Sequence, residues 1–179
     1  MLDRNNTALV LVDIQGNLAG LMHDKHNLYC NVQKLIRSLK VLNIPIIWLE
    51  QNPEGIGPTV PVIANLLEGQ SPISKMTFSA YTNKEFKQAL TASKCKQILV
   101  AGIESHVCVY QTVMDLHQAG FEVEVISDAV SSRTQSNKQL ALLKMQSQGV
   151  QLTSTEMALF ELLGTSEGQD FKEIIKIIK

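Results

Sequence analysis

The sequence predicts an α/β protein with a three-layer, Rossmann-like fold, in which helices flank a mainly parallel sheet of about five or six strands. Short runs of aliphatic and β-branched residues alternate with longer segments of helical periodicity, a pattern typical of parallel strands joined by crossover helices. The 179 residues, 45% hydrophobic and 18% charged, are enough for one sizeable core. We therefore expect a single domain over residues 1–179.

The predicted strands are short apolar runs. Thr7–Val12 is apolar beyond its first residue, as expected for a strand that is buried on both faces. In Ile44–Leu49 the proline stands near the start, where a missing N–H is tolerated. The other predicted strands are Lys96–Ile103, Glu122–Ile126 and, with a weaker pattern, Val150–Thr153; Ser74–Ser79 is a candidate for one more short strand.

Between the strands, apolar residues recur at helical spacing. Gly120 and Gly149 each follow such a segment, at the position of a left-handed helix C-cap. The predicted helices are Leu28–Leu42, Lys84–Ser93, Cys108–Gln118, Ser136–Ser147 and an amphipathic C-terminal segment, Phe171–Ile178, that we expect to dock on the domain. The stretch Asn52–Gln70 is rich in Gly and Pro, and we expect it to be a surface loop near the site.

Composition narrows the class of partner and the cellular setting. Sixteen basic and seventeen acidic residues give a formal net charge of −1, which argues against nucleic acid or an anionic membrane as partner and favours a small molecule. The three cysteines are widely spaced and form no CxxC pair, so we expect a reducing, cytoplasmic setting without disulfides or zinc. The apolar run Ala8–Val12 is interrupted by Asp13, so neither a signal-peptide core nor a spanning helix is predicted there.

Three chemically capable side chains follow predicted strands, at the edge where parallel sheets bind ligands. They are Asp13, Lys75 and Cys108. An ammonium and a helix N-terminus both stabilise a thiolate, and a nearby carboxylate can take the thiol proton and later activate water. Backbone N–H groups at the start of the same helix would then face the oxyanion.

Each of these residues also has a structural interpretation. A buried cysteine is most often an inert small hydrophobe, an aspartate after a strand is often a turn or helix cap, and a lone lysine usually faces solvent. Spacing in the sequence does not show that the three side chains converge.

Three segments, in order and spacing, resemble the motifs of the isochorismatase-like cysteine hydrolases: Val12–Gln15, Lys75–Ser79 and Ala101–Val109. Two more, Glu50–Val60 and Ser127–Arg133, resemble the subgroup called isochorismatase domain-containing proteins. The resemblance runs through essentially the whole chain. It implies an oligomeric hydrolase, and the exposed apolar loop region and amphipathic tail also favour a homo-oligomer.

The resemblance implies a catalytic triad in which Cys108 attacks an amide-like carbonyl, Asp13 is the general base, and Lys75 supports the thiolate and orients the substrate. It also implies a cis peptide at Ile103–Glu104, with the N–H groups of Glu104 and Cys108 aimed at the oxyanion. An amine would leave, and a water activated by Asp13 would hydrolyse the thioester.

Two departures from the wider family refine this prediction. Nicotinamidases hold a metal through an Asp-x-His pair after the second strand, where this chain has Glu50-Gln51-Asn52, so we expect no metal, no cofactor and a substrate other than nicotinamide. Isochorismatases proper cleave a vinyl ether and have no cysteine at the nucleophile position. The presence of Cys108 therefore favours acyl chemistry.

Several other side chains are candidates for lining the site. The candidate substrate-binding residues are Gln15, Trp48, Glu50, Phe78 and Tyr110. We expect His106 to pack or hydrogen-bond at the helix start rather than act as a base. For Arg133, binding of a substrate carboxylate and a structural pair with Asp128 both remain open.

The leading hypothesis is a metal-independent cysteine hydrolase of a small amide-like substrate. Two alternatives remain: vinyl ether hydrolysis by Asp13 and Lys75 without a covalent intermediate, and a non-catalytic binding or interaction module that keeps the fold. A dinucleotide-binding module is disfavoured, because the first strand-to-helix turn, Asp13–Gly20, lacks the G-x-G-x-x-G spacing.

Overall fold

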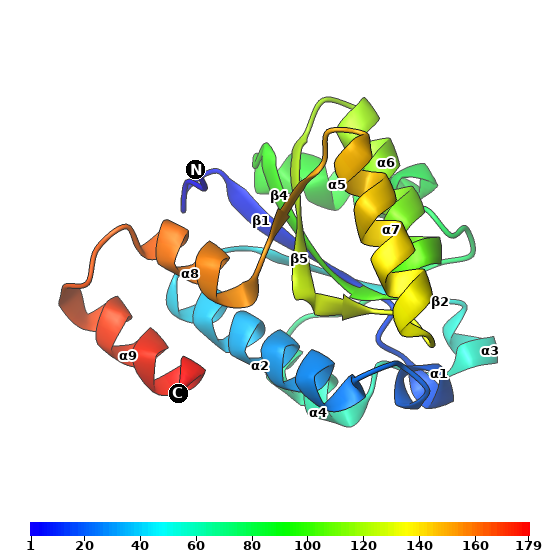
Figure 1. The fold of residues 1–179 in the computed structure, drawn as a ribbon, viewed down its shortest axis with the longest axis horizontal. Helices are drawn as coiled ribbons and strands as arrows, with labels where there is room; N and C mark the ends of the chain where they lie inside the picture. Colours follow the sequence, from blue (N-terminus) through cyan, green and yellow to red (C-terminus); the bar gives the residue numbers. More distant parts are fainter.

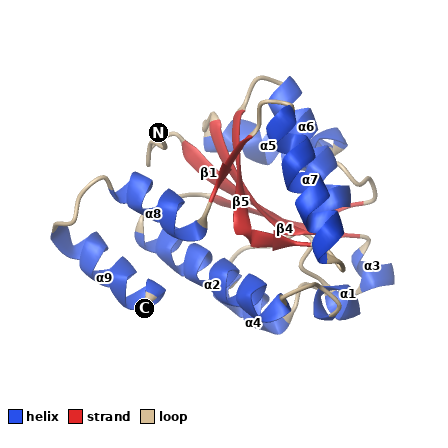
Figure 2. Cartoon of the chain, viewed as in Figure 1, coloured by secondary structure: helices blue, strands red, loops and turns tan.

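A six-stranded parallel sheet forms the middle layer of the computed structural model, which describes residues 1–179 (Figures 1 and 2). The strands follow the order β3-β2-β1-β4-β5-β6, so chain order reverses next to β1. Their bounds are Thr7–Val12 (β1), Ile46–Gln51 (β2), Ile73–Lys75 (β3), Gln97–Ile103 (β4), Glu122–Ser131 (β5) and Gln151–Thr153 (β6). The predicted three-layer α/β fold is confirmed. The candidate short strand at Ser74–Ser79 corresponds to β3, which begins one residue earlier and already ends at Lys75.

Helices cover both faces of the sheet (Figure 1). One face carries α2 (Lys25–Val41), α4 (Pro61–Ala64), α8 (Thr155–Leu163) and α9 (Gly168–Ile178). The other carries α5 (Lys84–Ser93), α6 (Tyr110–Gln118) and α7 (Gln135–Ser147). Two short helices, α1 (Gly16–Gly20) and α3 (Pro53–Ile56), lie together after the ends of β1 and β2. None of the helices has both the length and the apolar composition that a bilayer-spanning segment needs.

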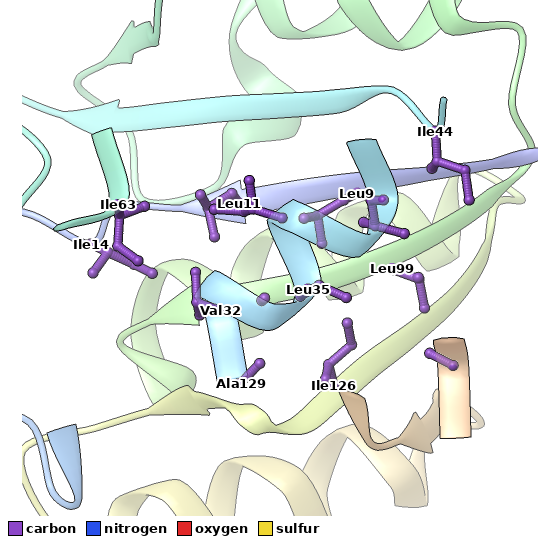
Figure 3. Packing of buried hydrophobic residues seen from close by; sticks show 14 of the residues in the cluster. Leu9, Leu11, Ile14, Val32, Leu35, Ile44, Ile63, Leu99, Ile126 and Ala129 are labelled. Atoms are coloured by element: carbon purple, nitrogen blue, oxygen red, sulfur yellow. The ribbon is translucent and has the colours of Figure 1, made fainter. Parts of the chain in front are cut away.

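The alternation of side chains along β1 divides the interior into two cores. Leu9 and Leu11 face Val32 and Leu35 of α2 (Figure 3), whereas Ala8, Val10 and Val12 belong to the core that α5, α6 and α7 cover. Because helices cover both faces, every residue of β1 is buried. This explains why the strand reads as a continuous apolar run.

The predicted helix Lys84–Ser93 has the same bounds as α5, and α7 begins one residue before the predicted Ser136, whereas α2 begins at Lys25 rather than Leu28; larger differences occur near the site and at the C-terminus. The helix predicted to begin at Cys108 starts as a π-helical turn, Ser105–Val109, and continues as α6. Helix α8 was not predicted; the Ser154 side chain caps it by accepting the N–H of Met157. The predicted C-terminal helix is confirmed as α9, which docks on α2 through fully buried Ile174.

Other differences concern strand length and loop content. Strand β2 begins at Ile46 rather than Ile44, because Pro45 has no N–H to give to the ladder. Strand β5 continues to Ser131, past a register shift opposite Val100–Gly102. The stretch Asn52–Gln70, expected to be a loop, contains α3, α4 and the 3-10 turn Asn65–Leu67.

Gly102 brings the ends of β1 and β4 unusually close. It pairs with Val12 in the parallel ladder and has a φ of +125°. A Cβ at this position would collide with the carbonyl oxygen of Val12, so no other residue fits without a shift of the backbone. The glycine therefore permits the close approach that sets Asp13, after β1, beside the chain that follows β4.

Candidate active site

A pocket of about 110 Å³ opens beyond the carboxyl ends of β1, β2 and β4. Ligands of open parallel sheets bind at this edge, next to the strand where chain order reverses. Its walls are formed by Asp13, Gln15, Leu18, Gln51, Ile56, Phe78, Ile103, Glu104, Val107 and Cys108. Two members of the predicted triad, Asp13 and Cys108, are thus exposed to the same small space.

Asp13 reaches the pocket because the backbone turns immediately after β1. Its φ is +50°, in the left-handed region that aspartate tolerates better than most residues. Its carboxylate is buried: Oδ2 accepts a hydrogen bond from Lys75, and Oδ1 has no hydrogen-bond partner. A buried carboxylate with one unpaired oxygen is well suited to accept a proton.

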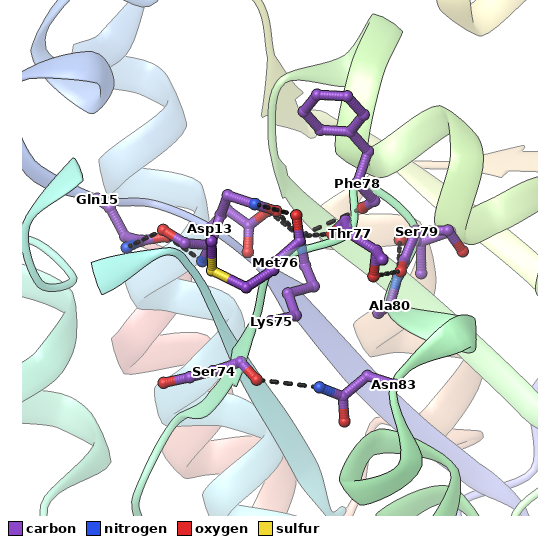
Figure 4. Close-up of polar contacts among 12 residues, drawn as sticks. Asp13, Gln15, Ser74, Lys75, Met76, Thr77, Phe78, Ser79, Ala80 and Asn83 are labelled. Carbon is purple, nitrogen blue, oxygen red and sulfur yellow. Dashed lines mark hydrogen bonds and ion pairs between the residues drawn. The ribbon is translucent and has the colours of Figure 1, made fainter. Parts of the chain in front are cut away.

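Lys75, the last residue of β3, is held behind Asp13 (Figure 4). Its Nζ donates to Asp13 Oδ2 at 2.6 Å, to Gln51 Oε1 at 2.7 Å and to the carbonyl oxygens of Thr77 and Phe78, both at 3.2 Å. The side chain is fully buried and does not line the pocket. Lys75 therefore lies behind Asp13 and holds its carboxylate in place, outside the lining of the pocket.

Gln51 is a site residue that the sequence analysis missed. It ends β2 and pairs with Lys75 in the parallel ladder, so the two side chains lie on the same face of the sheet. Its Oε1 accepts from Lys75 and its Nε2 donates to the carbonyl of Met76 at 2.9 Å. Its position at the carboxyl end of a strand, like that of Lys75, was a signal that could have found it.

Cys108 lies in the π-helical turn between β4 and α6. The N–H groups of Val107 and Val109 both donate to the carbonyl of Glu104, at 3.0 and 3.2 Å. This wide turn sets Cys108 ahead of the first residue of α6, with its side chain at the pocket. The peptide bond between Ile103 and Glu104 is cis, as the resemblance implied.

The electrostatics of the thiol differ from the prediction. Burial and, next, the negative charge of Asp13 raise the pKa of Cys108 to about 12, although the Lys75 ammonium acts in the opposite direction. Burial and the charge of Asp13 thus outweigh the effect of Lys75, so the prediction that the site stabilises the thiolate is wrong for the unliganded site. Burial also raises the pKa of Asp13, against the influence of Lys75. A carboxylate with a raised pKa is a stronger proton acceptor, so the pair is arranged for proton transfer from Cys108 to Asp13.

Glu104 forms a second ion pair at the pocket. Its Oε2 accepts from both the backbone N–H of Arg133, at 3.0 Å, and Arg133 Nε, at 3.1 Å. The structural pair of Arg133 with Asp128 is wrong: Asp128 instead accepts the N–H and hydroxyl of Thr155. The longer β5 explains the difference, because it carries Arg133 past Asp128 to the end of the sheet.

The candidate substrate-binding residues divide into two groups. Gln15 and Phe78 line the pocket, and the Phe78 side chain is largely exposed. Trp48, Glu50 and Tyr110 do not line it. Glu50 accepts from the backbone and hydroxyl of Thr59, Trp48 donates to that same hydroxyl, and Tyr110 packs under the ammonium of Lys144.

Strand alternation accounts for this division. Trp48 and Glu50 point to the opposite face of β2 from Gln51, away from Lys75. His106 donates to or accepts from the hydroxyl of Ser132 at 3.0 Å and does not line the pocket, in agreement with a packing role. No group of three or more His, Cys, Asp or Glu side chains is arranged to hold a metal ion.

Comparison with known proteins identifies the family. The model of the isochorismatase domain matches residues 7–157. The chain belongs to the isochorismatase family. It is 34% identical over 177 residues to isochorismatase domain-containing protein 2 of Danio rerio, and the match covers 99% of this chain and 89% of the relative.

Solved structures of similar fold support the same family assignment. The MAR1 ribonuclease from Caenorhabditis elegans superposes with a TM-score of 0.92 at 35% identity, covering 99% of this chain and 91% of that one. The YcaC gene product of Escherichia coli, an octameric hydrolase of unknown specificity, superposes with a TM-score of 0.92 at 27% identity. The match covers 98% of this chain and 89% of that one. Family membership supports a hydrolase and the isochorismatase domain-containing subgroup.

Proposed function

We propose that this protein is a metal-independent cysteine hydrolase of small amide-like substrates, acting through a thioester on Cys108. The observation that carries the proposal is the joint exposure of Asp13 and Cys108 to one small pocket, with Lys75 fixed behind Asp13 at 2.6 Å. A thiol, a base and a group that orients the base are the parts that nucleophilic acyl transfer requires.

In the first step, Cys108 Sγ forms a bond to the substrate carbonyl carbon while its proton passes to the Asp13 carboxylate. Because the pKa of the free thiol is about 12, the proton is transferred as the nucleophile attacks rather than beforehand. The tetrahedral intermediate then collapses. The C–N bond breaks, Asp13 returns the proton to the departing nitrogen, and an amine or ammonia leaves the thioester behind.

In the second step, water replaces the departed amine. Asp13 takes a proton from the water as its oxygen bonds to the thioester carbonyl, and the C–S bond breaks. The proton returns to Cys108, and the product is a carboxylic acid. Asp13 thus acts first as base and then as acid in each of the two steps, and the hydrogen bond from Lys75 keeps it in one orientation throughout. The N–H groups of Glu104 and Cys108 are the proposed donors to the oxyanion.

The test compares wild type with Cys108→Ala on a panel of small amides. We expect kcat/KM to fall by about 1,000-fold or more, since the covalent route is lost. Intact-mass spectrometry of wild type quenched during turnover should show an acyl adduct on Cys108. Cys95→Ala, which removes a buried thiol outside the pocket, is the matched control and should retain activity. Equal turnover by Cys108→Ala, or no amide hydrolysed by wild type, would refute the proposal.

A second candidate function is RNA cleavage, because the MAR1 neighbour is named a ribonuclease. The small pocket and the net charge of −1 favour the amide over RNA. Incubation of the same preparations with labelled single-stranded RNA separates the two functions. RNA cleavage that persists in Cys108→Ala would belong to another site or a contaminant, whereas cleavage lost with Cys108 would favour the ribonuclease.

We also propose a cytoplasmic homo-oligomer. The YcaC neighbour is octameric, and large apolar side chains are exposed on two helices here, at Leu140 and Leu143 of α7 and at Met157 and Phe160 of α8. Multi-angle light scattering of the purified protein tests the assembly, and a monomer at micromolar concentration would contradict it.

A further inference from the structure

Two acidic residues and no basic residue line the pocket. Asp13 and Glu104 both line it, whereas Lys75 and Arg133 do not. The Lys75 ammonium already has four hydrogen-bond acceptors around it, and Arg133 Nε is engaged by Glu104. A bound anion would therefore meet two negative groups without a free positive partner.

The polar amides of the pocket are engaged within the protein. The Gln15 side chain donates to the carbonyls of Gln51 and Gly57 and accepts the N–H of Gln51. The Gln51 side chain bridges Lys75 and the carbonyl of Met76. Both N–H groups of the Gln15 amide are thus used within the protein, and the Gln51 amide keeps a single N–H, too little to replace the hydration of a charged substituent. The remaining walls are apolar: Leu18, Ile56, Phe78, Ile103 and Val107.

We infer that the acyl group of the substrate is short, uncharged and apolar, and that the pocket rejects amides bearing a carboxylate or phosphate. This inference rests on the proposed cysteine hydrolase. The reacting carbonyl faces Cys108 and Asp13, and the rest of the acyl group lies against the apolar walls. A negative substituent there would lose its hydration and be repelled by Asp13 and Glu104.

The experiment compares two amides of similar size and shape, isovaleramide and malonamate, in which the isopropyl group of the first is replaced by the carboxylate of the second. We expect kcat/KM for malonamate to be lower by about 100-fold or more, because the pocket is lined by apolar and acidic residues and offers the added charge no cation. Along the neutral series acetamide, propionamide and butyramide, kcat/KM should rise about fourfold for each buried methylene until the pocket is full.

The variant Glu104→Gln supplies a charge-specific control, since it removes one negative group and keeps the backbone N–H of residue 104. The ratio of kcat/KM for malonamate to that for isovaleramide should rise by about tenfold, whereas a folding defect would lower both values together. If wild type hydrolyses malonamate as well as isovaleramide, the substrate class is overturned and the cysteine hydrolase remains. If wild type hydrolyses neither these amides nor the neutral series, and no acyl adduct forms on Cys108, the proposed function fails and the inference with it.

Discussion

Two ion pairs border the same pocket and differ in the exposure of their cations. In the first, Lys75 and Asp13 are 2.6 Å apart and their side chains are 0% and 5% exposed. In the second, Arg133 and Glu104 are 3.1 Å apart, and the arginine side chain is 57% exposed while Glu104 is 8% exposed. Water can take over part of the role of Arg133, but the buried Lys75 side chain has no such substitute.

The hydrogen-bond partners of the two carboxylates indicate which of them is better placed to exchange a proton. Glu104 Oε2 accepts from both the backbone N–H and the side chain of Arg133, and no oxygen of Glu104 is buried without a partner. Asp13 has its Lys75 partner on one oxygen only, and its other oxygen is buried without a partner. An unsatisfied buried oxygen is costly in a folded protein, which is consistent with a functional role for that atom.

The largest expected effect comes from Lys75→Met, which leaves the Asp13 charge buried without its counter-ion. We expect the free energy of unfolding to fall by about 3–5 kcal/mol. Urea denaturation measures it. The double variant Lys75→Met with Asp13→Asn should recover most of that loss, because it removes both charges together. Full stability in the single variant would show that the buried pair does not behave as a coupled unit.

A smaller effect concerns pH and the Cys108 thiol. Its pKa is raised from 9.0 to about 12 in the folded chain, so the folded state holds its proton over a range in which the unfolded state releases it. The free energy of unfolding of wild type, relative to that of Cys108→Ala, should therefore fall by roughly 1 kcal/mol per pH unit as the pH rises above 9. Below about pH 9 the difference between the two proteins should not depend on pH.

Urea midpoints of both proteins at about pH 8 and about pH 10.5 measure this difference, and comparison with Cys108→Ala cancels the titration of the other groups. A stability difference that is independent of pH would mean that the thiol has an ordinary pKa, and that burial beside Asp13 does not raise it.

The smallest effect is expected for Arg133→Gln. Glu104 keeps the backbone N–H of residue 133 at 3.0 Å, and the lost cation was already half in water, so the free energy of unfolding should fall by only about 1 kcal/mol. Activity should change less than about tenfold, because the exposed cation is screened by water. Urea or thermal denaturation of Arg133→Gln and Lys75→Met under the same conditions measures the two losses of stability. Equal losses would show that the two ion pairs do not differ in their contribution to folding.

Much of the fold followed from local patterns. Thr7–Val12 and Lys84–Ser93 have the same bounds in the sequence analysis and the structure, because a run buried on both faces and an amphipathic stripe are both local signals. The π-helical turn at Cys108 and the short helices in Asn52–Gln70 were not predicted, since they depend on contacts with distant segments.

The candidate site was predictable in part. The motifs identified Asp13, Lys75 and Cys108, and the alternation of side chains along β2 places Trp48 and Glu50 on the opposite face from Gln51, outside the pocket lining. The partner of Arg133 depends on where β5 ends, and that end follows from pairing with β4 across a register shift. No local signal in the sequence shows such a shift.

The sequence by itself determined the parallel α/β fold and the family, because alternating apolar periods and ordered motifs are local properties of the chain. Only the tertiary structure decided the chemical state of the site. Whether Cys108 is a thiol or a thiolate, and whether Lys75 is solvated or buried, depends on desolvation and on charges brought together from separate strands. Desolvation and the interaction between charges depend on burial and on distances in three dimensions, and the order of residues does not specify either.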